Sequence, residues 1–459
     1  MNRFRTSAGG LIDRSKRLTF TFDGSTYRGF AGDTLASALL ANGVHLVARS
    51  FKYHRPRGIL TAGSAEPNAL VAVRRDGARY TPNLRATQVE LYEGLEAESQ
   101  NRWPSLAFDT GAINGLAAPF IPAGFYYKTF MWPRQAWAQF YEPRIRARAG
   151  LGRAPASADP DQYSGRYAHC DVLVVGGGPA GLAAAFAAAG AGARVILCDE
   201  QSQFGGSLLT DTEAVIDGQP AEIWRHNVLA TLAREPRVRL LTRSTAFGYF
   251  PHNLIGINER LSDHLATVDA AAPRERLWQV RAREVVLATG SLERPLVFPG
   301  NDRPGVMLAG AARTYLHRYA VRCGTRAVVV AGCDAAYQAA LDLHAAGVAI
   351  IAISDPRPQA SGPWLDFARR AGLPVRPRTT VLATRGRLRV SSVHLGRIDS
   401  RGAVRPGSIL PCDLVLMSGG YTPSVHLFSQ SRGKLIWDDA LQAFIPGAGA
   451  ERERSAGAC

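Results

Sequence analysis

The chain has 459 residues, a mass of 49.4 kDa and a hydrophobic fraction of 46%, which excludes a globally disordered protein and predicts several packed domains. Its 54 basic and 38 acidic residues give a net charge of +16. Only Lys16, Lys52, Lys128 and Lys434 are lysines, and such an arginine bias, without a nucleic-acid-binding motif, predicts no nucleic-acid partner. With no long apolar run and no apolar segment near its start, we expect a cytoplasmic protein without a membrane span.

The first 95 residues predict a small β-grasp domain. Residues 18–30 alternate apolar and polar side chains around Asp23-Gly24, which predicts two strands joined by a tight turn. Asp33 is expected to cap the helix that follows, and Gly43 to end it. A hairpin, a helix and further strands in this order are typical of a β-grasp module.

Residues 96–165 form a predicted connector that is rich in tryptophan, tyrosine, phenylalanine, proline and arginine. Its aromatic side chains either pack loops onto a neighbouring domain or form a surface for a partner subunit. The sequence leaves both alternatives open.

The six cysteines include no CxxC or CxxxxC pair. This excludes a disulfide-reductase dithiol, a four-cysteine zinc site and a self-contained iron–sulfur cluster. We therefore predict buried free thiols and no metal site.

From Cys170 onward, strands and helices alternate. A strand, a helix and a strand are predicted at 172–175, 179–189 and 194–198, and the same order recurs at 326–331, 335–346 and 348–353. Two such units predict an α/β fold of nucleotide-binding, Rossmann-like type with parallel sheets.

The segment DVLVVGGGPAGLAAAFAAAG carries the strongest chemical signal. Gly176, Gly178 and Gly181 form G-x-G-x-x-G directly after one predicted strand and at the start of a helix. The first glycine permits the tight turn, the second lets backbone N–H groups approach a pyrophosphate, and the third lets the helix pack closely on the strand. With Pro179 and Ala180 at the helix N-terminus, they predict a dinucleotide site.

An acidic residue at the end of the next strand should accept hydrogen bonds from ribose hydroxyls. Asp199 and Glu200 both qualify, and Asp199 is the first choice because Gly205-Gly206 follows six residues later. An acid at this place favours NAD, or the ADP half of FAD, over NADP.

Two later strands end in glycine-containing turns, VVLATG at 285–290 and DLVLMSGGYTP at 413–423. They add Thr289, Gly290 and Gly420 to the predicted dinucleotide site. Both segments resemble the closing segments of flavoproteins with two dinucleotide-binding domains, such as thioredoxin and glutathione reductases.

That resemblance implies a first dinucleotide-binding domain with a second one inserted into it. The first comprises residues 166–300 and 411–459, and the second residues 301–410. The second unit has Gly332 after its strand, but Asp334 and Tyr337 stand where further glycines would be needed. We therefore expect the second nucleotide site to be degenerate.

A closer likeness is carried by the segments SFKYHRPRGILTAGSAEPNALVAV (50–73), GGGPAGLAAA, DEQSQFGGSLL, IWDDALQAFIPGA and ERERSAGAC. Together they resemble the α subunits of heterotetrameric sarcosine oxidases. Wider relatives are the α subunits of opine oxidase, proline dehydrogenase and hydrogen cyanide synthase. The likeness covers essentially the whole chain.

The resemblance implies an enzyme complex that oxidises sarcosine to glycine and reduces O₂ to H₂O₂. The amine is oxidised at FAD on a β subunit, and electrons pass to an FMN near the boundary of the two subunits. The α subunit holds NAD in its first nucleotide domain, where the residues named above fall. Further small subunits complete such a complex.

In this family the α chain is longer, and its C-terminal half binds tetrahydrofolate. We therefore expect either a fragment or a short member whose folate step is absent or on another chain. Catalytic residues are left unassigned, because no convincing general acid, base or nucleophile is present.

The resemblance also implies that the N-terminal domain derives from a ferredoxin. Cluster-bearing relatives carry cysteines before the strand that matches Leu70–Val73. Thr61, Glu66 and Ala69 stand at three of these positions, so we expect a domain without its cluster.

Arg49, Lys52, His54, Arg55 and Arg57 form a dense basic cluster. The cluster is either a solvated or interdomain face, or a contact for an anionic group such as an FMN phosphate or an acidic partner.

Two other hypotheses remain open. The chain is a self-sufficient FAD-dependent oxidoreductase that uses NAD(P)H, or it is a scaffold whose nucleotide is structural. Opine, proline and glycine remain alternative substrates, because the substrate pocket would lie in the partner.

Overall fold

A computed structural model describes residues 3–75, 79–120, 124, 130, 132–148 and 151–459. The chain divides into two compact units. Unit 1 comprises Met1–Asp159 and Pro295–Gly419, and unit 2 comprises Pro160–Arg294 and Gly420–Cys459. The boundaries expected at residues 95, 165, 300 and 410 remain predictions.

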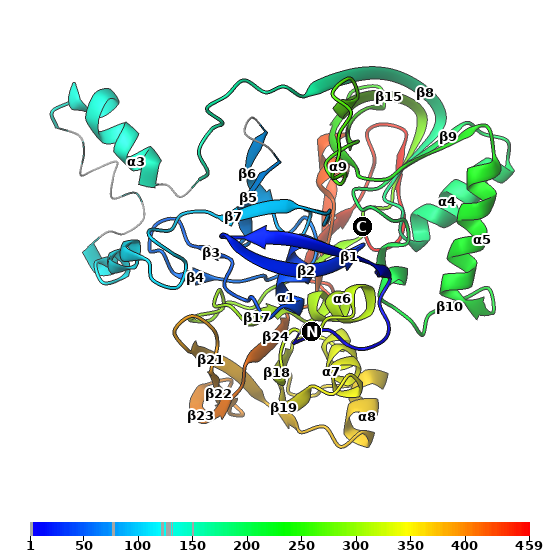
Figure 1. Cartoon of the computed structure of the whole chain (residues 1–459). Coiled ribbons are helices and arrows are strands. Elements are labelled where there is room, and N and C mark those ends of the chain that lie inside the picture. Colours follow the sequence, from blue (N-terminus) through cyan, green and yellow to red (C-terminus); the bar gives the residue numbers. More distant parts are fainter. Residues whose placement is uncertain (1–2, 76–78, 121–123, 125–129, 131, 149–150) are drawn as a thin grey trace. The chain divides into compact units, whose positions relative to one another are not determined.

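Unit 1 begins with a five-stranded mixed sheet in the order β2-β1-β7-β5-β6 (Figure 1). Its strands are β1 (Asp13–Phe22), β2 (Ser25–Ala31), β5 (Leu70–Arg74), β6 (Tyr80–Arg85) and β7 (Leu95–Ser99). The turn between β1 and β2 lies where the sequence places it, with Asp23 and Gly24 both at positive φ (+49° and +76°). Such a turn matches the twist of the strands it joins.

Helix α1 (Leu35–Ala41) packs against β2 of this sheet, and its N-cap differs from the expected one. Thr34 caps the helix by accepting a hydrogen bond from the N–H of Ser37. Asp33 is instead fully buried and binds Arg5 through both carboxylate oxygens at 2.9 and 2.7 Å. The expected cap was therefore off by one residue, because a remote arginine uses the aspartate.

The remainder of unit 1 holds a parallel five-stranded sheet in the order β17-β24-β18-β19-β20 and a three-stranded antiparallel sheet, β21-β22-β23. Parallel strands are β17 (Val306–Leu308), β18 (Arg326–Ala331), β19 (Ala349–Asp355), β20 (Val375–Pro377) and β24 (Leu414–Ser418). Helices are α6 (Ala309–Tyr319), α7 (Ala335–Ala345) and α8 (Pro363–Arg370), and antiparallel strands are β21 (Thr379–Arg385), β22 (Ser392–Ile398) and β23 (Val404–Pro411).

One continuous hydrophobic core joins the β-grasp sheet to this second α/β region within unit 1. Backbone hydrogen bonds reinforce the joint, from Leu308 N to Leu60 O at 2.9 Å and from Arg322 N to Phe4 O at 2.9 Å. The sequence showed no sign of this association, since its partners are separated by more than 200 residues.

Unit 2 is built on the sheet β12-β9-β8-β15-β14-β13, with β28 beside β15. Its strands are β8 (Gln162–Val175), β9 (Val195–Cys198), β12 (Val238–Leu241), β13 (Ser244–Phe250), β14 (Leu254–Arg260), β15 (Pro273–Leu287) and β28 (Glu453–Ser455). The longest pair, β8 and β15, is parallel and runs from Gln162 beside Pro273 to Val175 beside Leu287.

Strand β8 begins ten residues before the strand that the sequence predicted at 172–175. Its first half is polar and largely exposed, so it carries no apolar run that would reveal it. The long ladder with β15 supplies the backbone partners that make this half a strand.

The sheet of unit 2 is covered on both faces. Helices α4 (Pro179–Gly190) and α5 (Ala221–Arg234) pack side by side over Val174 and neighbouring core residues (Figure 1). Leu173 and Val175, which alternate with Val174 along β8, belong to a separate core with α9 (His426–Gln430). Both faces are buried, as the continuous apolar run at 172–175 predicts.

Short elements complete the structure. They are β3 (Ala48–Arg49), β4 (Pro56–Arg57), β10 (Val215–Ile216), β11 (Gln219–Pro220), β16 (Ser291–Glu293), β25 (Tyr421–Pro423), β26 (Leu435–Asp438), β27 (Ala443–Pro446), a 3₁₀ turn at Gly206–Leu209, and in the connector the turns Thr110–Gly115, Ala118–Phe120 and Trp137–Tyr141 with α3 (Glu142–Arg148). Among the described residues, no helix is long and apolar enough to cross a membrane.

The connector leaves several large aromatic side chains in solvent. Trp103, Phe120 and Trp132 are 69%, 85% and 83% exposed. The aromatic residues at 125–127, for which the sequence predicted the same role, lie outside the described part of the chain. Large exposed apolar side chains are typical of interaction surfaces, and both alternatives for this segment stay predictions.

His45 gives unit 1 a stability that depends on pH. Its side chain is buried against Phe4, and burial, with a contribution from Arg389, lowers the pKa to about 3. Arg3 acts in the same direction and Asp413 in the opposite one. Because the unfolded chain protonates near pH 6.5 and the folded chain does not, we expect stability to fall with decreasing pH by up to about 1.4 kcal/mol per unit.

Chemical denaturation at pH 7, 6 and 5 would measure this effect. The substitution His45→Phe keeps a ring in the core and should remove this part of the slope. His226→Phe is the control, because its imidazole is 65% exposed on the surface of α5 and lies outside unit 1. An unchanged slope in His45→Phe would contradict the assignment.

Candidate functional site

The fingerprint loop of unit 2 follows β8, and its first and third glycines are required by backbone contacts. Gly176 has a φ of +98°, and a Cβ on it would overlap the carbonyl of Ala288. A Cβ on Gly181 would overlap the carbonyl oxygen of Gly176. No side chain can move to relieve either overlap, so both positions need glycine.

Gly178 differs, because it borders open space. It is the N-cap of α4, with Pro179 at the first helical position. A Cβ on Gly178 would find its nearest neighbour, the Cα of Gly206, at 3.9 Å. The start of a helix presents backbone N–H groups without intrahelical partners, here near Ala180 and Gly181, and carries a partial positive charge. This open cradle fits a phosphate group.

The segment 204–206 forms a wall beside the loop. The N–H of Gly205 donates to Gly177 O at 2.8 Å, and the ring of Phe204 packs on Gly177. Gly206 has a φ of +54°, and a Cβ on it would lie 2.8 Å from the Cα of Gly178. The predicted pair Gly205-Gly206 therefore lies against the fingerprint loop.

Asp199 lies at the end of β9 and is held by backbone donors. One carboxylate oxygen accepts from Gly177 N at 2.6 Å, and the other accepts from Gln201 N at 2.8 Å. These bonds fix the carboxylate beside the loop, where a ribose would follow the pyrophosphate. Glu200 is half-buried, and its carbonyl accepts from Arg260 at 3.3 Å.

The closing segment contributes through Ala288, whose carbonyl contacts Gly176. Thr289 Oγ1 donates to Ser424 O at 2.8 Å, and Gly290 accepts from Ser424 N at 2.9 Å. Gly420 accepts from the N–H of Arg294 at 2.8 Å. Thr289 and Gly290 thus directly follow Ala288, while Gly420 immediately precedes β25, which pairs with β16.

The sequence did not assign Gly457 to the site. Strand β28 runs parallel to β15, and Ala456 N donates to Leu287 O at 2.9 Å. Gly457 has a φ of +84°, and a Cβ on it would lie 3.0 Å from the Cβ of Ala180. The segment SAGAC therefore passes close to the start of α4. A glycine just after a short strand was the signal that could have found it.

The second α/β region, in unit 1, fills the corresponding place with its own side chains. Asp334 precedes α7 and accepts hydrogen bonds from the N–H groups of Trp364 and Leu365, both at 3.3 Å. Tyr337 is fully buried and donates to Asp355 at 2.6 Å. Asp355, at the end of β19, is also paired with Arg357 at 2.6 Å.

These contacts occupy the groups that a nucleotide would need. The acid at the end of the second strand is neutralised by Arg357 and bonded to Tyr337. Asp334, the N-cap residue of α7, places a carboxylate-bearing side chain where the fingerprint would have a glycine, and this carboxylate is bonded to the start of α8. They support a degenerate second site.

The basic cluster is mostly paired within unit 1. Arg49 is buried, donating to the carbonyls of Leu106 and His54. Arg55 and Arg57 both pair with Asp302, at 2.8 and 3.0 Å. The cluster therefore has internal acidic partners that the sequence did not connect with it.

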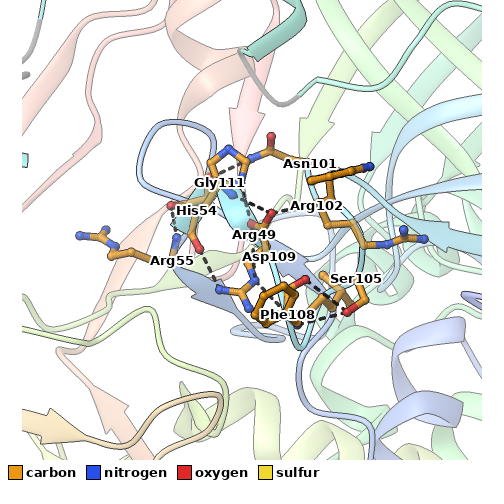
Figure 2. Close-up of polar contacts among 12 residues, drawn as sticks. Arg49, His54, Arg55, Asn101, Arg102, Ser105, Phe108, Asp109 and Gly111 are labelled. Carbon is orange, nitrogen blue, oxygen red and sulfur yellow. Dashed lines mark hydrogen bonds and ion pairs between the residues drawn. The ribbon is translucent and has the colours of Figure 1, made fainter. Parts of the chain in front are cut away.

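Figure 2 shows His54 and Asp109 pointing toward one another, while Arg55 points away. His54 Nδ1 lies 2.7 Å from Asp109, whose other oxygen accepts from Trp103 N and Gly111 N. His54 has a φ of +51° and borders a cavity of about 1040 Å³.

All six cysteines are free. Cys170, Cys198, Cys323 and Cys412 are buried, and burial raises the pKa of each thiol, to about 12 for Cys170, Cys323 and Cys412. The part of the chain that the structure describes has no group of three or more His, Cys, Asp or Glu residues that could hold a metal.

A Rossmann-like sheet with a glycine-rich loop, a helix N-terminus and a strand-end carboxylate defines a dinucleotide-binding oxidoreductase fold. Residues 170–447 match the model for pyridine nucleotide-disulphide oxidoreductases, and the chain belongs to this family. Residues 15–102 match the model of a 2Fe-2S iron-sulfur cluster binding domain. The chain thus combines FAD/NAD-type dinucleotide binding with a ferredoxin-like domain.

Two curated relatives confirm the resemblance noted in the sequence. Sarcosine oxidase subunit alpha from Rhizobium meliloti (strain 1021) is 52% identical over 98% of this chain and 44% of its own length. The corresponding subunit from Corynebacterium sp. (strain P-1) is 37% identical over 98% of this chain and 42% of its own length. The chain therefore spans less than half the length of these relatives.

A solved structure shares the fold of the whole chain. L-proline dehydrogenase from P. horikoshii superposes with a TM-score of 0.63 at 18% identity, covering 100% of this chain and 71% of the other. The predicted α/β fold, with a ferredoxin-like domain before a dinucleotide-binding region, is confirmed.

The iron–sulfur cluster implied by the N-terminal match does not fit the residues present. The first cysteine of the chain is Cys170, so residues 15–102 contain no thiolate. Thiolates hold such clusters in proteins. No electron-transfer step is therefore assigned to this domain.

Substitutions of Gly178 and Gly181, the two glycines at the start of α4, should have different effects on stability and on dinucleotide binding. In Gly181→Ala the new Cβ meets the Gly176 carbonyl, so we expect a loss of at least about 1–3 kcal/mol of stability, as for overpacking. In Gly178→Ala the Cβ enters open space, so we expect a folded protein that has lost most of its dinucleotide affinity.

Gly190→Ala is the matched control in the same helix, because nothing lies within 4 Å of its Cβ. Thermal unfolding and titration with NAD and FAD would separate the three variants. Wild-type affinity in Gly178→Ala would contradict the assignment of the phosphate cradle.

Proposed function

We propose that this chain is the dinucleotide-binding part of the α subunit of a sarcosine oxidase. The observation that carries the proposal is the 52% identity to a sarcosine oxidase subunit alpha over 98% of the chain. The complex would convert sarcosine, water and O₂ into glycine, formaldehyde and H₂O₂. Amine oxidation would take place on a β subunit that carries FAD.

The role of this chain is to bind a dinucleotide and the partner. The cradle at Gly178 and the fixed carboxylate of Asp199 support NAD, or alternatively the ADP half of FAD, in unit 2. The other predicted site residues are part of the same proposal. An FMN at the boundary with the β subunit, and tetrahydrofolate on a longer chain, follow from the likeness alone.

The exposed aromatic side chains of the connector support a subunit interface. Tryptophan and phenylalanine are enriched at the centres of protein–protein interfaces, and Trp103, Phe120 and Trp132 are exposed within one segment of unit 1. We assign this segment to the contact with the β subunit.

We further propose that the second α/β region binds no dinucleotide, because Tyr337, Asp334 and Arg357 occupy its functional groups. This argues against the alternative of a self-sufficient FAD enzyme reduced by NAD(P)H. Without a second open site, the second α/β region offers no place for a nicotinamide donor.

Co-expression with a sarcosine oxidase β subunit tests the proposal. We expect a stable complex whose sarcosine-dependent H₂O₂ production, followed with a peroxidase-coupled assay, requires both chains. Extraction and absorption spectra of the bound nucleotides would distinguish NAD from FAD. Phe120→Ser should weaken association without changing folding, since the ring is 85% exposed.

Two outcomes would overturn it. One is a chain that associates with no β-type partner. The other is a chain that is yellow on its own and is bleached by NADH, which would establish the FAD-dependent alternative.

A further inference from the structure

The loop at residues 60–69 surrounds a buried carboxylate. Glu66 is 1% exposed. Its Oε2 accepts from Leu60 N at 2.9 Å, Thr61 N at 2.7 Å and Thr61 Oγ1 at 3.2 Å. Its Oε1 accepts from Asn68 N at 2.8 Å and Ala69 N at 3.1 Å. Every donor belongs to the same loop.

The positions in this loop have the spacing of a cluster-binding loop. Thr61, Glu66 and Ala69 follow the pattern C-x₄-C-x₂-C of plant-type ferredoxins, with each cysteine replaced. In such proteins, hydrogen bonds from the loop reach the sulfur atoms of the cluster and tune it. Here four backbone N–H groups converge on one carboxylate.

We propose that the Glu66 carboxylate replaces the cluster as the anionic centre that organises this loop. The domain is thereby converted from an electron carrier into a structural element of unit 1. A single side chain satisfies amides at both ends of the loop, from 60–61 and from 68–69, and so closes the loop without metal.

The surroundings of the loop support an ionised Glu66. Burial raises the pKa of this carboxyl above its usual value, and the hydrogen bonds from Thr61, Asn68, Leu60 and Ala69 offset only part of that rise. The support for the ionised form is the geometry, because all five contacts reach the two oxygens from donors. Four amide donors and a hydroxyl are a set that a carboxylate accepts with both oxygens. Ionised acceptors make the stronger hydrogen bonds.

The closed loop in turn contacts the second α/β region of unit 1. Tyr315 of α6 is fully buried and donates to Thr61 O at 2.8 Å. The N–H of Leu308 donates to Leu60 O at 2.9 Å. Both acceptors are carbonyls of residues whose N–H groups bind Glu66. The carboxylate therefore orients the peptide groups through which the β-grasp domain docks.

Hydrogen exchange of the loop amides tests this role directly. We expect Glu66→Gln to accelerate exchange at residues 60, 61, 68 and 69 by at least about tenfold, because an amide side chain offers one acceptor oxygen in place of two. Glu96→Gln is the control, since Glu96 is exposed on β7 of the same sheet. It should leave exchange at these amides unchanged.

Iron analysis of the wild-type chain tests the conversion independently. After anaerobic incubation with ferrous iron, sulfide and a thiol reductant, we expect no visible absorption of a cluster and only substoichiometric iron and sulfide, since the six cysteines all lie outside residues 15–102. A stoichiometric cluster with visible absorption that resides in residues 15–102 would overturn the proposal.

Unchanged exchange in a folded Glu66→Gln protein would also overturn it. If that variant does not fold, Glu66→Asp keeps the charge on a side chain one methylene shorter, which cannot reach both pairs of amides. Wild-type exchange in Glu66→Asp would then contradict the proposed geometry, while accelerated exchange at one pair would support it.

Discussion

The contact between Gly181 and the carbonyl of Gly176 is the constraint on which the nucleotide unit depends. It brings the start of α4 against the end of β8 at a distance that no side chain permits. The helix N-terminus then opens toward the space beside Gly178, and Asp199 can bond to Gly177. The wall at Phe204 and the closing segment at Ala288 are in turn positioned against the same loop.

The two α/β regions share one architecture but differ in whether the helix start and the strand-end acid are open to a ligand. In unit 2, glycine at position 178 leaves room at a helix start, and the strand-end carboxylate is held by backbone donors. In unit 1, the carboxylate of Asp355 at the end of β19 is already bonded to Tyr337 and paired with Arg357. The proposed role of Glu66 in the β-grasp domain is of the same kind, because its carboxylate accepts hydrogen bonds from the loop N–H groups. At both places in unit 1, side chains of the chain itself bond to one another or to the backbone.

The sequence predicted what depends on local rules. The turn at Asp23-Gly24, the helix at 179–189 and the fingerprint loop all follow from short patterns, and the structure has them in place. It did not predict the polar half of β8, which exists only through its pairing with β15. The sequence also did not predict the ion pair between Arg5 and Asp33, or the hydrophobic core that the β-grasp sheet shares with the second α/β region. These features depend on partners far away in the chain, and no local pattern encodes them.

The burial of the thiols has a consequence for their reactivity toward an oxidant. Peroxide attacks the thiolate rather than the thiol, and exposure governs the rate. Cys170, Cys198, Cys323 and Cys412 are enclosed, and their raised pKa values keep them protonated at neutral pH. Under the proposed function, in which the complex releases peroxide, this burial would keep these four thiols from reacting with it.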